Sequence, residues 1–246
     1  MTIEPETFVD LPTEHGPMRV NLFVPTGGKR HAAIIFYSEI FQITGPIRRV
    51  AVLLAGNGYL VAVPEVYHEF EPAGTVLAYD QAGADRGNEL KFTKELASYD
   101  ADVEALTGFL SKHERCNGSI ASFGVCLGGH LAVRAGLHPL IQATAAFYST
   151  DLHSATLGAG KNDDTMLRIA EARSPFLFVF GRQDPHVPLE GRRKIQARLE
   201  EVGAEYEWHE FNAAHAFLRD EGPRYDASLS RISIELMLRF FSEKLR

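Results

Sequence analysis

The stretch from Gly118 to Ala132 constrains the fold most, because it joins a buried strand to a helix through a glycine-rich turn. Its first part, residues 119–123, is a short apolar run that predicts a strand, and the apolar spacing from Leu127 onward predicts a helix. The turn itself reads Gly-Val-Cys-Leu-Gly, a strand-to-helix elbow with Cys126 at its apex. Such an elbow strains the backbone at its apex and leaves little room for nearby Cβ atoms, which explains the glycines.

Cys126 at this apex has two interpretations. As a nucleophile, it would stand at the N-terminus of a helix, where the helix dipole and free N–H groups favour a thiolate and a developing oxyanion. As a structural residue, it would be a buried and inert thiol, since free cysteine is among the most buried residue types. The elbow alone does not decide between the two interpretations.

Composition narrows the class of protein. A chain of 246 residues with 45% hydrophobic residues fits one domain covering residues 1–246. The net charge of −7, without a run of Lys or Arg, argues against nucleic acid or an anionic membrane as a partner. We find neither a signal peptide nor an apolar stretch of about 18 residues, so the sequence predicts a cytoplasmic protein.

The two cysteines, Cys116 and Cys126, are too far apart along a predicted strand to form a disulfide. We expect both to be free thiols, with Cys116 in a structural role. They do not form the closely spaced pair typical of a metal site.

Buried strands and helices alternate along the chain, which predicts parallel pairing. The predicted fold is therefore α/β, a doubly wound and mostly parallel sheet flanked by helices and preceded by an antiparallel hairpin. Two long segments, residues 65–97 and 149–163, are predicted as loops that roof a pocket. The predicted elements are a hairpin at 6–25, strands at 31–37, 59–63, 119–123, 141–148, 175–180 and 206–211, and helices at 46–56, 100–110, 164–172, 189–202 and 225–244.

Three residues that could take part in nucleophilic catalysis follow the ends of predicted strands. In open parallel sheets, binding and catalytic sites lie at the carboxyl ends of the strands. Cys126, Asp184 and His215 occur in the order nucleophile, acid, histidine that the α/β-hydrolase fold uses. A base must reach the nucleophile and be oriented by a third group, and this set supplies all three parts. His186 is a rival base, but it lies two residues from the acid, and we interpret it as a packing or surface residue.

Four motifs together resemble the dienelactone hydrolase family, over about residues 18–243. They are Phe36-Tyr-Ser-Glu-Ile-Phe41, Gly124-Val-Cys-Leu-Gly-Gly129, Gly181-Arg-Gln-Asp-Pro-His-Val-Pro188 and His215-Ala-Phe217. The resemblance implies an α/β-hydrolase fold with Cys126 as the nucleophile, His215 as the base and Asp184 as the orienting acid. It also implies that Glu39 holds the resting thiol and that the backbone amides of Ile40 and Leu127 form the oxyanion hole.

The resemblance also bears on the substrate. Arg219 matches a family arginine for a substrate carboxylate, although it would otherwise be interpreted as a surface residue. A second family arginine is missing, because the matching region reads Tyr67-His68-Glu69, and Gln42 stands where the family often has glycine. We expect Tyr67, His68 and Tyr148 to contact the substrate as well.

The expected protein is a carboxylic-ester hydrolase of small esters or lactones. It would act through a thioester acyl-enzyme, without metal or organic cofactor, as a monomer or homodimer. The alternatives are a thioesterase and a non-catalytic ligand-binding module of the same fold.

Overall fold

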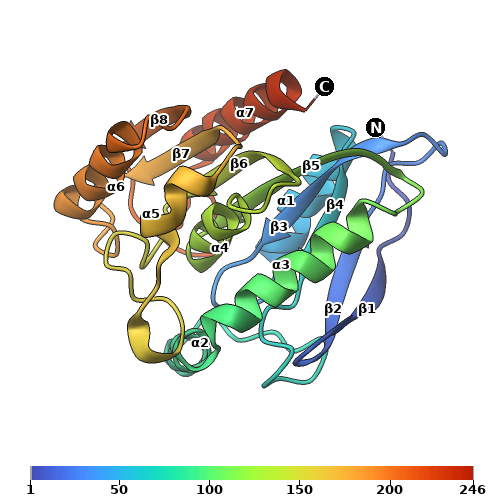
Figure 1. Cartoon of the computed structure of the whole chain (residues 1–246), viewed down its shortest axis with the longest axis horizontal. Coiled ribbons are helices and arrows are strands. Elements are labelled where there is room, and N and C mark those ends of the chain that lie inside the picture. Colours follow the sequence, from blue (N-terminus) through green and yellow to red (C-terminus); the bar gives the residue numbers. More distant parts are fainter. Residues whose placement is uncertain (1, 246) are drawn as a thin grey trace.

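A computed structural model describes residues 2–245 and contains an eight-stranded sheet with helices on both faces (Figure 1). The strand order is β1-β2-β4-β3-β5-β6-β7-β8. The strands are β1 (Thr7–Thr13), β2 (Gly16–Phe23), β3 (His31–Tyr37), β4 (Leu60–Pro64), β5 (Cys116–Val125), β6 (Ile141–Phe147), β7 (Phe176–Gly181) and β8 (Tyr206–Phe211).

Strand direction follows the prediction. The hairpin β1–β2 is antiparallel and β2 pairs antiparallel with β4, whereas β3 to β8 pair in parallel. The seven residues of β3 are all buried because both faces of the sheet are covered there. The predicted α/β-hydrolase fold, with its N-terminal hairpin and mostly parallel sheet, is confirmed.

The part of the chain that the structure describes contains seven α-helices. They are α1 (Gly45–Gly56), α2 (Gln81–Thr93), α3 (Leu96–Leu110), α4 (Leu127–Ala135), α5 (Thr165–Arg168), α6 (Leu189–Glu201) and α7 (Ala227–Lys244). Helices α1 and α7 share one apolar core with the sheet, and α3 and α4 share another on the opposite face. None of the helices within residues 2–245 is long and apolar enough to cross a membrane.

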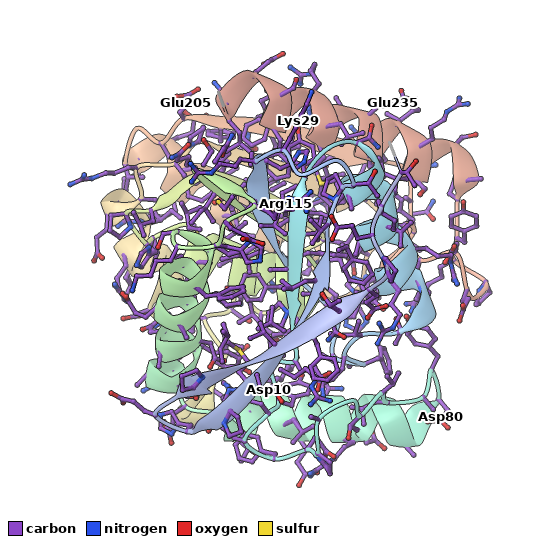
Figure 2. All side chains as sticks on the ribbon, turned by 90° about the vertical axis from the view of Figure 1, so that its right-hand side faces the viewer. Asp10, Lys29, Asp80, Arg115, Glu205 and Glu235 are labelled. Carbon is purple, nitrogen blue, oxygen red and sulfur yellow. The ribbon has the colours of Figure 1, made fainter. Side chains whose placement is uncertain are left out.

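The segment from residue 65 to 97, called the insertion below, differs from its prediction as a loop. It contains α2, and α3 begins at Leu96 rather than at residue 100. Apolar periodicity is weak in α2, which includes Gly83 and Gly87, so the pattern did not indicate a helix. Asp80 caps the N-terminus of α2, because its carboxylate accepts a hydrogen bond from the Gly83 amide at 2.8 Å. Figure 2 shows Asp80 at the opposite end of the molecule from Glu235 on α7.

Two smaller differences concern boundaries. Strand β5 begins at Cys116, earlier than predicted, and the predicted helix at 164–172 consists of α5 followed by a short 3₁₀ turn (Ile169–Glu171). Cys116 and Cys126 are both free and buried, as expected.

Candidate active site

The elbow after β5 fixes Cys126 in a strained conformation. Its φ of 58° and ψ of −123° lie in a region that non-glycine residues rarely adopt. A Cβ on Gly124 would lie 1.8 Å from the Gly128 carbonyl oxygen, and one on Gly128 would lie 2.1 Å from the Tyr37 carbonyl oxygen. The glycines of the motif are therefore needed because α4 starts almost in contact with β3 and β5.

The backbone at the elbow is held on both sides of Cys126. Its amide donates to the Phe147 carbonyl at 3.1 Å, and its carbonyl accepts from the amides of Gly129 and Thr150 at 3.0 and 3.2 Å. Leu127 is the first residue of α4, so no helical carbonyl lies four residues before it to accept from its amide. The elbow thus presents an amide donor next to the thiol.

Asp184 and His215 meet at the ends of the neighbouring strands β7 and β8. His215 Nδ1 lies 2.6 Å from Asp184 Oδ2, and the His186 amide donates to Asp184 Oδ1 at 2.8 Å. Both carboxylate oxygens are therefore engaged, and the Asp184 side chain is fully buried. This arrangement leaves Nε2 of His215 free to face another group.

Cys126 lines the same cavity as His215, and the two side chains interact electrostatically. Burial lowers the pKa of His215, but the charge and hydrogen bonds of Cys126 and Asp184 outweigh it and raise the pKa to about 10. The imidazolium form is thus favoured at neutral pH, between an aspartate and a thiol. A cationic imidazole beside the sulfur is the kind of environment in which reactive cysteines occur.

A cavity of about 220 Å³ opens over Cys126 and His215. Its walls come from the loop after β3, from α2, and from the loops after β6, β7 and β8. A larger and mainly apolar cavity of about 550 Å³ lies between the α5 region and α6, and its lining contains neither Cys126 nor His215. We therefore select the smaller cavity as the candidate site because of its chemistry.

Glu39 and Arg219 form a polar wall of this cavity. Arg219 Nη1 lies 3.6 Å from Glu39 Oε2, and the Tyr79 hydroxyl donates to the same oxygen at 3.1 Å. The guanidinium of Arg219 also lies over the Tyr79 ring, 4.2 Å from its centroid. Glu39 was expected to hold the resting thiol, whereas in this structure its side chain is bound to Arg219 and Tyr79.

Several cavity residues were not singled out from the sequence, among them Asn88, Lys91 and Arg224. Lys91 of α2 donates to Asp151 Oδ2 at 2.7 Å, and Asn88 lies one turn before it. Arg224 is exposed at the rim and has no carboxylate partner within residues 2–245. The first two were missed because α2 was not predicted, and a lone arginine in a polar loop carries no sequence signal.

Three side chains that were expected to contact the substrate lie outside the cavity, whereas His186 is an exposed residue that packs against His215, in keeping with its interpretation from the sequence. Tyr67 is fully buried and donates to the Gly87 carbonyl at 3.1 Å, and His68 is bound to Asp102 at 2.9 Å. Tyr148 is buried edge-on against His215, with ring centroids 5.1 Å apart. None of these three lines the cavity, whereas His186 does, with its ring 4.7 Å from that of His215.

Comparison with known proteins supports one family. The model of the dienelactone hydrolase family matches residues 18–245. This chain belongs to the dienelactone hydrolase family. A putative carboxymethylenebutenolidase of Saccharomyces cerevisiae is 38% identical, covering 98% of this chain and 92% of the relative. The carboxymethylenebutenolidase of Pseudomonas putida is 25% identical, covering 85% of this chain and 84% of the relative.

A solved structure confirms the fold. The crystal structure of a putative dienelactone hydrolase from Klebsiella pneumoniae superposes with a TM-score of 0.84 at 20% identity, covering 99% of this chain and 100% of that one. Family membership makes this chain a hydrolase of the carboxylic-ester class, as the sequence predicts.

Proposed function

We propose that the protein hydrolyses small esters or lactones through a Cys126–His215–Asp184 triad. The observation that carries the proposal is the position of His215, which is hydrogen-bonded to Asp184 and lines the same cavity as Cys126. A base that reaches the nucleophile and is oriented by a buried acid is the geometry that nucleophilic catalysis needs.

The reaction begins when the Cys126 thiolate attacks the substrate carbonyl. The carbonyl electrons move onto oxygen, and the amides of Leu127 and Ile40 stabilise this oxyanion. Collapse of the tetrahedral intermediate expels the alkoxide, which takes a proton from the His215 imidazolium. An ester thus releases an alcohol, whereas a lactone opens and keeps its hydroxyl on the acyl group.

Water then cleaves the thioester. Neutral His215 takes a proton from water as the oxygen attacks the acyl carbon, and the second intermediate collapses to the acid and the Cys126 thiolate. Asp184 stabilises the imidazolium that forms in this step. Arg219 would bind a substrate carboxylate, because its guanidinium lines the cavity beside Glu39.

The proposal is tested by hydrolysis of p-nitrophenyl acetate and of a dienelactone. We expect the wild-type protein and Cys116→Ala to turn over the ester, and Cys126→Ala to lose this turnover. Cys116 is a matched control because it is also a free and buried cysteine. Equal activity in Cys126→Ala and the wild type would refute the nucleophile assignment, and a silent wild type on both compounds would refute the proposed activity.

A further inference from the structure

The insertion contacts the loop that carries one of the two oxyanion amides. We call residues 39–44, between β3 and α1, the oxyanion loop. The Leu77 amide donates to the Phe41 carbonyl at 3.1 Å, and Gln42 Nε2 donates to the Thr75 carbonyl at 3.3 Å. The insertion therefore binds the backbone of this loop as well as lining the cavity.

Tyr79 of the insertion holds the side chains of the same loop. Its hydroxyl pairs with Thr44 Oγ1 at 2.6 Å and donates to Glu39 Oε2 at 3.1 Å. Its ring packs edge-on against Phe41, with centroids 4.8 Å apart. Contacts from the insertion thus reach both ends and the centre of the oxyanion loop.

Gly87 of α2 lies directly against Ile40. A Cβ on Gly87 would lie 2.5 Å from the Ile40 carbonyl oxygen, 2.9 Å from its Cβ and 3.2 Å from its carbonyl carbon. These are mainly backbone atoms and the first side-chain carbon, so no flexible group can move aside. Only glycine lets α2 lie this close to Ile40 without displacing it.

Gly87 is also fixed from its other side. Its carbonyl accepts the hydrogen bond from the buried Tyr67 hydroxyl at 3.1 Å. Since Tyr67 lies in the turn just after β4, which ends at Pro64, this bond ties the middle of α2 to the end of the sheet. Movement of α2 away from Ile40 would strain this bond, so we expect a larger residue at position 87 to displace Ile40.

We propose that Gly87 is a positioning residue for the oxyanion hole. Its missing side chain lets α2 seat Ile40, and this contact sets the position of the Ile40 amide relative to Cys126. The inference rests on the proposed function, because that function gives the Ile40 amide its role. In this proposal the insertion also contributes to transition-state stabilisation, in addition to lining the substrate cavity.

The test compares Gly87→Ala with Gly108→Ala. Gly108 lies in α3, where an added Cβ meets nothing within 4 Å, so it is a matched helical control. For Gly87→Ala we expect kcat for p-nitrophenyl acetate to fall about 100-fold with little change in KM, as for a reacting group misplaced by about 1 Å. An aryl trifluoromethyl ketone is attacked by the thiol at its carbonyl carbon and then carries the negative charge on the former carbonyl oxygen. The affinity of Gly87→Ala for this inhibitor should fall to a similar extent.

Alkylation of Cys126 by iodoacetamide distinguishes this role from general damage. That displacement forms no oxyanion, so its rate should stay within about twofold of wild type. A folded Gly87→Ala protein with wild-type kcat would overturn the proposal. Alkylation that slows as much as hydrolysis would overturn it too, because the defect would then lie at the thiol.

A second variant covers the case in which Gly87→Ala does not fold. Tyr67→Phe keeps the buried ring but removes the hydroxyl from the Gly87 carbonyl, and we expect a severalfold lower kcat with unchanged alkylation. Wild-type kcat in this variant would contradict the proposal. Failure of the proposed function is distinguishable, because it would appear as a wild-type protein whose hydrolysis does not depend on Cys126.

Discussion

Replacing Asp184 with Asn tests the electrostatic core of the site. The pKa of His215, ordinarily 6.5, is raised to about 10, so the imidazolium is favoured by on the order of 5 kcal/mol relative to an exposed histidine. Asp184 contributes to this through its charge and through the 2.6 Å hydrogen bond to Nδ1. Asn removes the charge, and its amide N–H can donate to Nδ1 and impose the wrong tautomer.

We expect Asp184→Asn to lower kcat/KM for an alkyl ester about 10³–10⁴-fold near pH 8, as loss of the acid does in comparable triads. The pH dependence has a definite sign. Because the pKa of His215 is raised, its imidazolium persists through neutral pH and is lost as pH rises through about 10. An alkyl ester has a poor leaving group that needs this proton, so wild-type kcat/KM should fall through about pH 10.

The assay is a pH-stat measurement of kcat/KM between pH 6 and pH 11. In Asp184→Asn the alkaline decline should move down by more than one pH unit. Asp85→Asn, on the exposed surface of α2, is the matched control and should behave as wild type. An alkaline decline at the same pH in Asp184→Asn and wild type would refute the reasoning that Asp184 supports the imidazolium.

Three further variants probe the cavity and the elbow. Arg224→Gln should raise KM about 10-fold for esters that carry a carboxylate and leave KM for neutral esters unchanged, because Arg224 has no carboxylate partner among the described residues and is available to bind one. Equal effects on KM for both ester types would contradict this. Lys91→Met leaves the largely buried Asp151 carboxylate unpaired and should lower the free energy of unfolding in urea by about 2–3 kcal/mol, so an unchanged midpoint would count against it. Gly124→Ala places a Cβ 1.8 Å from the Gly128 carbonyl oxygen and should lower the free energy of unfolding by more than about 3 kcal/mol. Gly108→Ala is the control and should leave it unchanged, and thermal denaturation measures both variants.

The sheet was predictable because its central strands are continuous apolar runs bounded by glycine, proline or polar residues. A strand such as β3 is buried on both faces, so its composition alone indicates its place. The positions of Cys126, Asp184 and His215 after three strands followed from the same pattern, because parallel strands present their carboxyl ends at one edge. Here the local sequence and the tertiary fold agree.

Helix α2 was not predictable from the sequence because its glycines are required by tertiary contacts rather than favoured by helix propensity. Gly83 and Gly87 are unfavourable in an isolated helix by about 1 kcal/mol each, yet a Cβ at either position would meet backbone atoms within 2.5 Å. The cavity residues Asn88 and Lys91 depend on this helix and were missed with it.

The two proposed oxyanion donors belong to different parts of the molecule. The Leu127 amide is fixed by the elbow, whose glycines pack against the central strands, whereas Ile40 is held by the insertion. The backbone of Cys126 is held by hydrogen bonds to Phe147, Gly129 and Thr150, and these three residues lie outside the insertion. Substitutions in the elbow should therefore slow hydrolysis and alkylation together, and substitutions in the insertion should slow hydrolysis alone. This difference arises because the Leu127 amide belongs to the elbow, whereas the Ile40 amide belongs to the loop that the insertion holds. A substitution in the insertion can therefore change the catalytic rate without changing the reactivity of the thiol.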